Sequence, residues 1–285
     1  MRTFKLRIAA ILLGITLCTT FTLRAQSVFY PTASAFTEAN GRAFTAPLNN
    51  ASRLQQIFSA SAFGATPVTI TKVAIRPDAA QVSSFSNAFT RLRIDLSTAS
   101  VAVGGLSATF AANIGGNNAT VFDGAITLST TNQLGPGTSK LFDVVIPLTT
   151  PFSYNPTAGN LLLDIRNYDV DFTGYIDTQV GSGNQLVFSD SGPTATAGTV
   201  QAAGLVIRFT ILEPPPIISI SRSVTGNQYS LIYTGRVGAY YTLQSSTDLS
   251  LWSSSGSVLT TTGTNVIALI ANANETRRFW RLKQE

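Results

Sequence analysis

The chain has 285 residues, of which only 12% are charged, and its 19 Lys and Arg against 14 Asp and Glu give a net charge of +5. It contains one Cys, one Met and no His. Without histidine the chain has no Ser-His-Asp triad and no imidazole general base. A zinc site of the usual Cys/His type is excluded for the same reason.

Residues 1–25 have the features of an export signal. Basic residues precede an uncharged apolar run of 16 residues, Ile8 to Leu23, and the small residue Ala25 stands before the expected cleavage point. The run is shorter than the ~20 residues that a membrane-spanning helix needs. We therefore expect cleavage after Ala25, export to the cell surface or medium, and no membrane span in the mature protein. A lipoprotein signal that ends at Cys18 is the alternative.

Cleavage changes the composition of the mature chain. Residues 1–25 hold four of the 19 basic residues and no acidic residue, so 15 basic and 14 acidic side chains remain, with a net charge of +1. The only Cys and the only Met also lie in this segment. No disulfide can then cross-link the fold, and no clustered Lys and Arg are present to bind a nucleic-acid backbone. We expect no nucleic-acid partner.

Short runs of β-branched and aromatic residues, separated by Gly, Pro, Asn and Ser, predict an all-β fold. Residues 89–97 place Leu92, Ile94 and Leu96 on one face of a strand and charged residues on the other. Residues 67–77 alternate in the same way but change phase at Thr71, which indicates a β-bulge. Five further strands are expected at 120–129, 141–148, 160–168, 184–189 and 204–212.

The long connection from Ala99 to Asn118 is expected to hold one or two helical turns within residues 106–115. Such a long loop on a sandwich is also a place where function is often found.

The proline-rich segment Glu213 to Pro216 predicts a linker, because consecutive prolines cannot donate ladder hydrogen bonds. On this basis residues 26–212 form a large jelly-roll-like β-sandwich. Residues 217–285 form a small immunoglobulin- or fibronectin-III-like β-sandwich. Both tryptophans of the chain, Trp252 and Trp280, lie in the small unit.

The C-terminal unit carries the sequences YYTLQSSTDLSLW and, some 25 residues later, RRFWRL. These resemble a module at the C-terminus of many secreted verrucomicrobial and planctomycete-type proteins, with the pattern Y-x-L/V-Q-x-STDL-x-x-W and a closing FYRL strand. The matching residues are Tyr241, Leu243, Gln244, Ser246, Thr247, Asp248, Leu249, Trp252, Phe279, Arg281 and Leu282, with Trp280 where Tyr is commoner. The resemblance implies an immunoglobulin- or fibronectin-like sandwich and no enzymatic activity.

The N-terminal domain carries the segments RLQQIFSASAF, IRPD, LRIDLSTAS, TVFDGAITLS and PFSYNPTAGNLLLDI. Together they resemble exported bacterial proteins of unknown function, many of which carry a C-terminal sorting anchor of the PEP-CTERM type. This chain has the STDL module in that place. The resemblance implies a secreted β-sandwich and transfers no catalytic residue.

The stretch LLLDIRNYDVDFTGYID, residues 161–177, contains four aspartates. If alternate residues from Leu161 face the core, Asp164 faces outward and Leu162 is an outward apolar residue that needs a covering loop. Asp169, Asp171 and Asp177 then fall in or after the following turn. A pair of carboxylates with backbone carbonyls is a candidate Ca²⁺ site, although the Gly and Glu of an EF-hand loop are missing.

The alternative is a solvated turn in which Asp164 or Asp169 pairs with Arg166. Tyr168 and Tyr175 flank the two turn carboxylates of Asp169 and Asp171. Aromatic and acidic side chains together on a loop are candidates for binding a neutral glycan, and the alternative role is packing within the turn.

These observations lead us to expect a secreted, non-enzymatic protein of the cell surface or extracellular matrix with a structural or adhesive role. Its expected partners are extracellular polysaccharide or cell-surface components, and no cofactor is expected apart from the Ca²⁺ candidate. The alternative is a polysaccharide hydrolase, since two carboxylates across a cleft suffice for glycoside cleavage.

Overall fold

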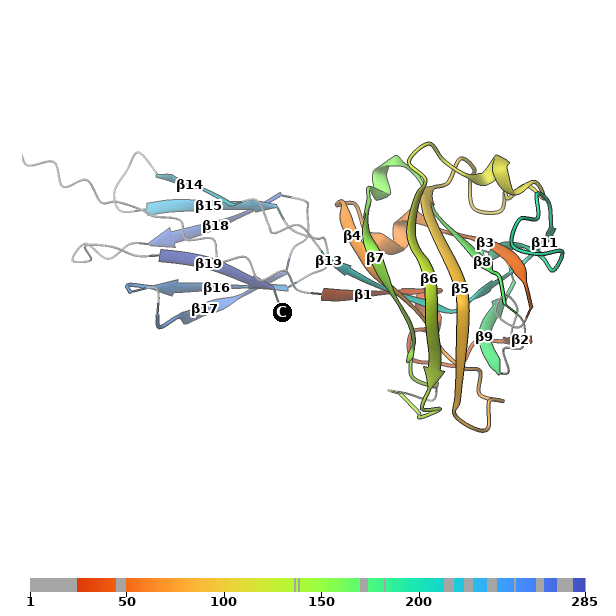
Figure 1. The fold of residues 1–285 in the computed structure, drawn as a ribbon. Coiled ribbons are helices and arrows are strands. Elements are labelled where there is room, and N and C mark those ends of the chain that lie inside the picture. Colours follow the sequence, from red (N-terminus) through yellow and green to blue (C-terminus); the bar gives the residue numbers. More distant parts are fainter. Residues whose placement is uncertain are drawn as a thin grey trace, which may run out of the picture. The chain divides into compact units, whose positions relative to one another are not determined.

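The computed structural model describes residues 25–44, 50–135, 137, 139–169, 174–181, 183–212, 218–222, 228–234, 240–248, 250–259, 264–270 and 279–284. The described residues form antiparallel β-sheets with four short 3-10 helices, so the predicted all-β sandwich class is confirmed (Figure 1). None of the helices found there has the length and apolar character needed to cross a membrane. The chain divides into two compact units, Leu23–Pro214 and Pro215–Glu285.

The large unit contains thirteen strands among its described residues. They are β1 (Ala25–Tyr30), β2 (Gly41–Phe44), β3 (Ser52–Phe58), β4 (Val68–Ile75), β5 (Phe85–Thr98), β6 (Ala119–Thr130), β7 (Val144–Tyr154), β8 (Leu161–Asn167), β9 (Tyr175–Val180), β10 (Gln185–Ser189), β11 (Thr199–Gln201), β12 (Ala203–Leu205) and β13 (Ile207–Leu212). The 3-10 helices are η1 (Thr32–Ser34), η2 (Ala60–Phe63), η3 (Phe110–Asn113) and η4 (Pro156–Ala158).

The strand order of the large unit is that of a jelly roll. One sheet has the order β1-β13-β4-β7, and the other has the order β11-β10-β3-β8-β5-β6. If β2 and β9 to β12 are set aside, the eight remaining strands, counted along the chain, form sheets 1-8-3-6 and 2-7-4-5. This double Greek-key order defines the jelly roll. A third small sheet, β12-β9-β2, adds to the sandwich.

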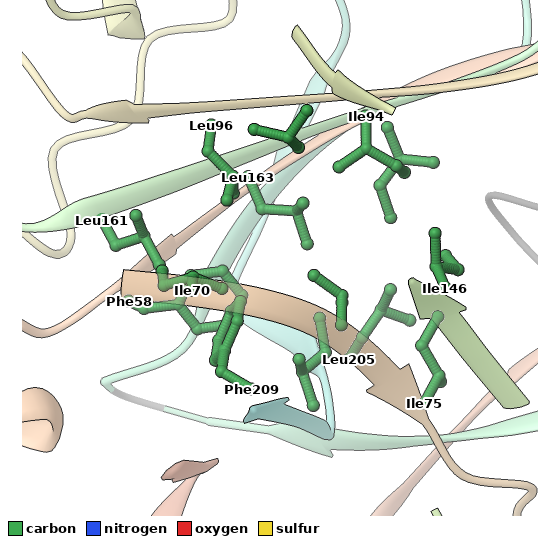
Figure 2. Packing of buried hydrophobic residues seen from close by; sticks show 14 of the residues in the cluster. Phe58, Ile70, Ile75, Ile94, Leu96, Ile146, Leu161, Leu163, Leu205 and Phe209 are labelled. Carbon is green, nitrogen blue, oxygen red and sulfur yellow. The ribbon is translucent and has the colours of Figure 1, made fainter. Parts of the chain in front are cut away.

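The hydrophobic core lies between the two large sheets. Figure 2 shows Ile70 and Phe209 of the four-stranded sheet among Phe58, Ile94 and Leu163 of the six-stranded sheet. All five side chains are completely buried. Phe58 makes edge-to-face ring contacts with Tyr30 and Phe209 at centroid distances of 5.1 Å and 5.0 Å, a favoured geometry for aromatic pairs. Apolar residues from both sheets therefore close one continuous core.

The alternating patterns in the sequence correspond to the observed faces. Leu92, Ile94 and Leu96 of β5 are all completely buried in the core, as predicted. The phase change at Thr71 is a bulge, since the register between β4 and β7 shifts between Ile70 and Lys72. In these strands one face is buried and the other is polar, so the period of two is visible in the sequence.

Five strands of the large unit, β1, β2, β3, β9 and β11, were not predicted, and β3 and β9 show why. Every residue of β3 is buried, including the polar residues Arg53 and Gln55, so no alternation marks it in the sequence. Tyr175 and Asp177 were expected in or after the turn that follows β8, and they lie in β9, which pairs with β2 and β12. Asp177 is a completely buried carboxylate, so the sequence did not mark it as part of a strand.

The segment from Ala99 to Asn118 covers part of the outer face of the six-stranded sheet. Leu106 packs there against Leu162 of β8 and Ile57 of β3. The helical turn expected in this segment is η3, a short 3-10 helix. Leu162 is 1% exposed, so the outward apolar residue predicted in β8 has the covering loop that it requires.

The small unit has six strands among its described residues. They are β14 (Ile218–Arg222), β15 (Gln228–Thr234), β16 (Tyr240–Ser246), β17 (Ser253–Leu259), β18 (Thr264–Ile270) and β19 (Phe279–Gln284). They form two antiparallel sheets, β14-β15-β18 and β17-β16-β19. Two small antiparallel sheets agree with the predicted immunoglobulin- or fibronectin-like sandwich. The buried side chains include Leu231, Tyr233 and Trp280, which supply the apolar interior of this unit.

The STDL motif forms a hydrogen-bonded turn after β16. The carboxylate of Asp248 accepts hydrogen bonds from the backbone N–H groups of Ser250 and Leu251 at 2.9 Å and 3.0 Å. It also accepts one from the hydroxyl of Ser246 at 2.9 Å. These bonds, that from the Leu251 N–H first, lower the pKa of Asp248 below its ordinary value. Asp248 thus has a local structural role.

We predict that Phe58→Ala lowers the free energy of unfolding of the large unit by about 3–5 kcal/mol, because a fully buried ring is replaced by a cavity. Urea unfolding followed by far-UV circular dichroism measures the change. Val82→Ala is the control, since Val82 is 91% exposed and its truncation should cost no more than about 0.5 kcal/mol. Equal losses in the two variants would contradict this account of the core.

A second prediction concerns the STDL turn. Asp248→Ala should lower the unfolding midpoint of the small unit at pH 7, and intrinsic tryptophan fluorescence reports on this unit because both tryptophans lie in it. A carboxylate with a lowered pKa stabilises the fold above its ordinary pKa and loses this contribution as the pH falls. The difference between wild type and variant should therefore shrink below about pH 4. Leu251→Ala, which truncates an exposed side chain in the same turn, is the control.

Candidate functional site

Asp169, a predicted ligand residue, forms a structural contact at the end of β8. Its carboxylate accepts hydrogen bonds from the Thr90 hydroxyl at 2.5 Å and from the Arg91 backbone N–H at 2.9 Å. Its own N–H donates to the side-chain oxygen of Asn167 at 2.9 Å. Burial raises the pKa of Asp169, but these hydrogen bonds to the charged form outweigh it and leave the pKa below its ordinary value. Asp169 therefore fastens the end of β8 to β5.

Tyr168 packs against an arginine of the neighbouring strand. The guanidinium carbon of Arg91 lies 4.3 Å from the centre of the Tyr168 ring, within the range of a cation–π contact. The Tyr168 N–H also donates to the Arg91 carbonyl at 3.3 Å. Arg91 in turn donates two hydrogen bonds to Asp123 of β6, at 2.8 Å and 2.9 Å. The three side chains form a partly exposed stack.

The other two predicted residues are not shown to join this stack. Asp171 lies outside the described residues, so the Ca²⁺ site predicted at Asp169 and Asp171 stays a prediction. Tyr175 begins β9, and its backbone N–H donates to the side-chain oxygen of Gln81 at 2.8 Å. Its backbone therefore contacts the segment that follows β4.

Asp164 was expected in a solvated turn, paired with Arg166; the ion pair with Arg166 is present, but Asp164 is buried, so the solvated setting was wrong. Its carboxylate lies 2.6 Å from the Arg53 Nη2 atom, and the two side chains are only 2% and 8% exposed. Gln55 donates a further hydrogen bond at 2.8 Å, and the Phe110 ring lies 4.4 Å from the Arg53 guanidinium carbon. The closest Arg166 atom is 3.5 Å away. The pair is buried because η3 and the segment around Ala195, whose carbonyl binds Arg53, cover this part of the sheet.

The uncovered part of the six-stranded sheet presents an ordered row of charged side chains. Arg166 of β8 lies opposite Arg93 of β5, which lies opposite Asp123 of β6. The side chains of Arg91, Arg93, Asp123 and Arg166 are 47%, 28%, 29% and 20% exposed. We call these four residues, together with the partly exposed Tyr168, the arginine face.

Asp95 is a buried carboxylate that contacts two arginines of the arginine face, Arg93 and Arg166. It is 1% exposed and receives hydrogen bonds from Arg93 at 2.9–3.1 Å and from the Thr120 hydroxyl at 2.6 Å. Arg166 approaches it at 3.8 Å, and the Nε atom of Arg166 is buried without a hydrogen-bond acceptor. The arginines are therefore held in position by carboxylates, and a part of each guanidinium remains accessible.

A second group of acids was not found from the sequence. Asp177 of β9 is paired with Arg76, which follows β4, and both side chains are completely buried. The Arg76 Nε atom donates to Asp177 at 2.7 Å. One carboxylate oxygen from each of Glu38, Asp78 and Asp177 lies within 4.8 Å of the other two. Burial raises the pKa of Asp177 to about 6 against the opposing effect of Arg76, and burial also raises the pKa of Glu38.

The only local sequence signal for this group is the run IRPD, in which Arg76 and Asp78 flank a proline directly after a buried strand. Glu38 and Asp177 join it from distant parts of the chain. Their proximity follows from the pairing of β9 with β2 and from an isolated bridge between Pro77 and Ile176, which no local pattern encodes.

The geometry defines an all-β sandwich protein with two groups of ordered charged side chains, one on an open sheet face and one buried. The chain matches no family model, no curated protein and no solved structure.

We predict that Asp164→Ala destabilises the large unit by about 3–5 kcal/mol, because it leaves the Arg53 guanidinium buried without its counter-charge. The matched control is Asp123→Ala, which breaks the exposed pair with Arg91 and should cost less than about 1 kcal/mol. Urea unfolding of both variants measures the two values. Losses of similar size would mean that the covering loops do not exclude water from Arg53.

Proposed function

We propose that this protein is an exported, non-catalytic β-sandwich protein with a structural or adhesive role, which binds a neutral extracellular polysaccharide through the arginine face. The observation that carries the proposal is the row formed by Arg91, Arg93, Arg166 and Asp123 beside the Tyr168 ring. The export signal supplies the location, and jelly rolls include lectin domains, which is an argument by analogy of fold.

The chemistry of the arginine face suits sugar hydroxyl groups. A guanidinium carries five N–H donors and a carboxylate several acceptor sites, so each paired side chain retains capacity for a ligand. The pairing also fixes the side chains before a ligand arrives, which reduces the entropy that is lost on binding. Tyr168 adds an aromatic ring whose exposed part can contact the apolar face of a sugar.

The charge balance favours a neutral polysaccharide over an acidic one. Each exposed arginine of the face has a carboxylate within 4 Å, namely Asp123 for Arg91 and Asp95 for Arg93 and Arg166. A polyanion would have to compete with these internal carboxylates, whereas hydroxyl groups can bind beside them. The same pairing supports a non-catalytic role at Asp123, because the hydrogen bonds from Arg91 lower the pKa of this carboxylate and make it a poor general acid.

We predict that the full-length mature protein is retarded in native gels that contain a neutral polysaccharide, and that Tyr168→Ala and Arg91→Ala each weaken this retardation at least tenfold. Lys72→Ala is the control, since Lys72 is exposed on the four-stranded sheet. Retardation by a panel of neutral and uronic polysaccharides identifies the ligand class.

Three results would contradict this proposal. The first is no retardation by any neutral polysaccharide, and the second is equal retardation of wild type and both variants. The third is the release of reducing sugar during prolonged incubation, which would support the hydrolase alternative.

A further inference from the structure

Three segments of the large unit bring together the half-buried Glu38 and the buried Asp78 and Asp177. Glu38 lies between η1 and β2, Asp78 follows β4, and Asp177 belongs to β9. The Asp177 N–H donates to the Arg76 carbonyl at 3.1 Å, and the Asp78 N–H donates to the Tyr175 carbonyl at 3.0 Å. These backbone bonds fix the two aspartates next to each other independently of their side chains.

Glu38 is held in place by a hydrogen bond to its carboxylate. One of its oxygens accepts a hydrogen bond from the Ala79 N–H at 2.7 Å, directly beside Asp78. Asp78 accepts one from the Ala80 N–H at 2.8 Å. The short turn after β4 thus supplies backbone donors to two of the three carboxylates and orients them toward Asp177.

Two carboxylate oxygens in this group have no hydrogen-bond donor. The Oδ1 atom of Asp177 belongs to a side chain with no solvent exposure, and it receives no hydrogen bond. The Oε2 atom of Glu38 is likewise buried without a donor. A buried anionic oxygen without a partner is costly, and a ligand commonly satisfies it. These two oxygens are therefore available to a ligand, which is an observation independent of the clustering of the acids.

The charges around this space favour a divalent cation. Three carboxylates face one guanidinium, that of Arg76, which leaves two negative charges in the group. Lys140 is the other cation that acts on Glu38, and its Nζ atom donates to the Asn132 carbonyl at 3.2 Å. The Arg76 pairing occupies the Oδ2 atom of Asp177 and leaves its Oδ1 atom unsatisfied.

We propose that Glu38, Asp78 and Asp177 bind one Ca²⁺ ion in the large unit. Ca²⁺ binds oxygen ligands at 2.3–2.6 Å, so oxygens on opposite sides of the ion are about 5 Å apart. The three carboxylates meet this limit, since one oxygen from each lies within 4.8 Å of the other two. Glu38 is only half-buried, which gives the ion a route from solvent, and water completes its coordination.

The ion would connect the segment before β2, the end of β4 and strand β9. This site is separate from the one predicted at Asp169 and Asp171, and it does not depend on polysaccharide binding. Extracellular Ca²⁺ sites usually have dissociation constants of about 10⁻⁴–10⁻³ M, so millimolar Ca²⁺ fills this one.

The test is isothermal titration of the metal-free, full-length mature protein with CaCl₂, together with thermal unfolding in 5 mM CaCl₂ and in EDTA. We expect one ion per chain at this site and a higher midpoint of unfolding in Ca²⁺. Glu38→Gln and Asp78→Asn should each weaken binding at least tenfold and remove the effect on the midpoint. Both variants retain side-chain size, and circular dichroism at 20 °C checks that they fold.

Asp190→Asn is the matched control, because it removes an exposed carboxylate of the same unit and should leave Ca²⁺ affinity unchanged. The proposal is overturned if the wild type binds no Ca²⁺, as when a water molecule alone fills the space. It is also overturned if Asp169→Asn abolishes binding while Glu38→Gln does not, since the ion would then lie in the turn after β8.

Discussion

The large unit depends on the burial of apolar side chains between two sheets, because the chain after residue 25 has no cysteine with which to cross-link them. Phe58 and Phe209 meet in edge-to-face contact across this interface, and strands from both sheets contribute completely buried aliphatic residues. Burial is the main source of stability here. A polar group that a loop buries on the outer face of a sheet therefore needs a hydrogen-bond or charge partner within the protein. The ordered charges of this structure follow from that requirement.

Two enclosed arginines show how the requirement is met. Arg53 and Arg76 each bind an aspartate from a strand that is more than 90 residues further along the chain, and each also stacks on a phenylalanine ring. A buried ion pair adds little net stability compared with apolar residues, but it penalises any arrangement that separates the partners. In this fold the pairs favour the correct register of β3 with β8 and the correct approach of β9 to the end of β4.

The sequence allowed the all-β class and the faces of several strands to be predicted, because half-buried strands show a period of two. Leu92, Ile94 and Leu96 are the clearest case, and the bulge in β4 was visible as a break in phase. The pattern failed where loops bury the outer face of a strand, as in β3. Asp164 and Asp177 then resemble surface residues in the sequence, although both are buried.

Of the predicted site residues, Tyr168 lies in the arginine face, Asp169 supports it by a structural contact, and Asp171 lies outside the described residues.

The pairing of β1 with β13 has a mechanical consequence. The first and last strands of the large unit are antiparallel neighbours, and Ala25 lies opposite Leu212 at the end of the ladder. Tension applied to the two ends of this unit would load the terminal hydrogen bonds first and open the ladder one bond at a time. The same arrangement lets the chain enter and leave the unit at one point, which is the geometry of a domain that can be inserted into a longer protein without disturbing its core.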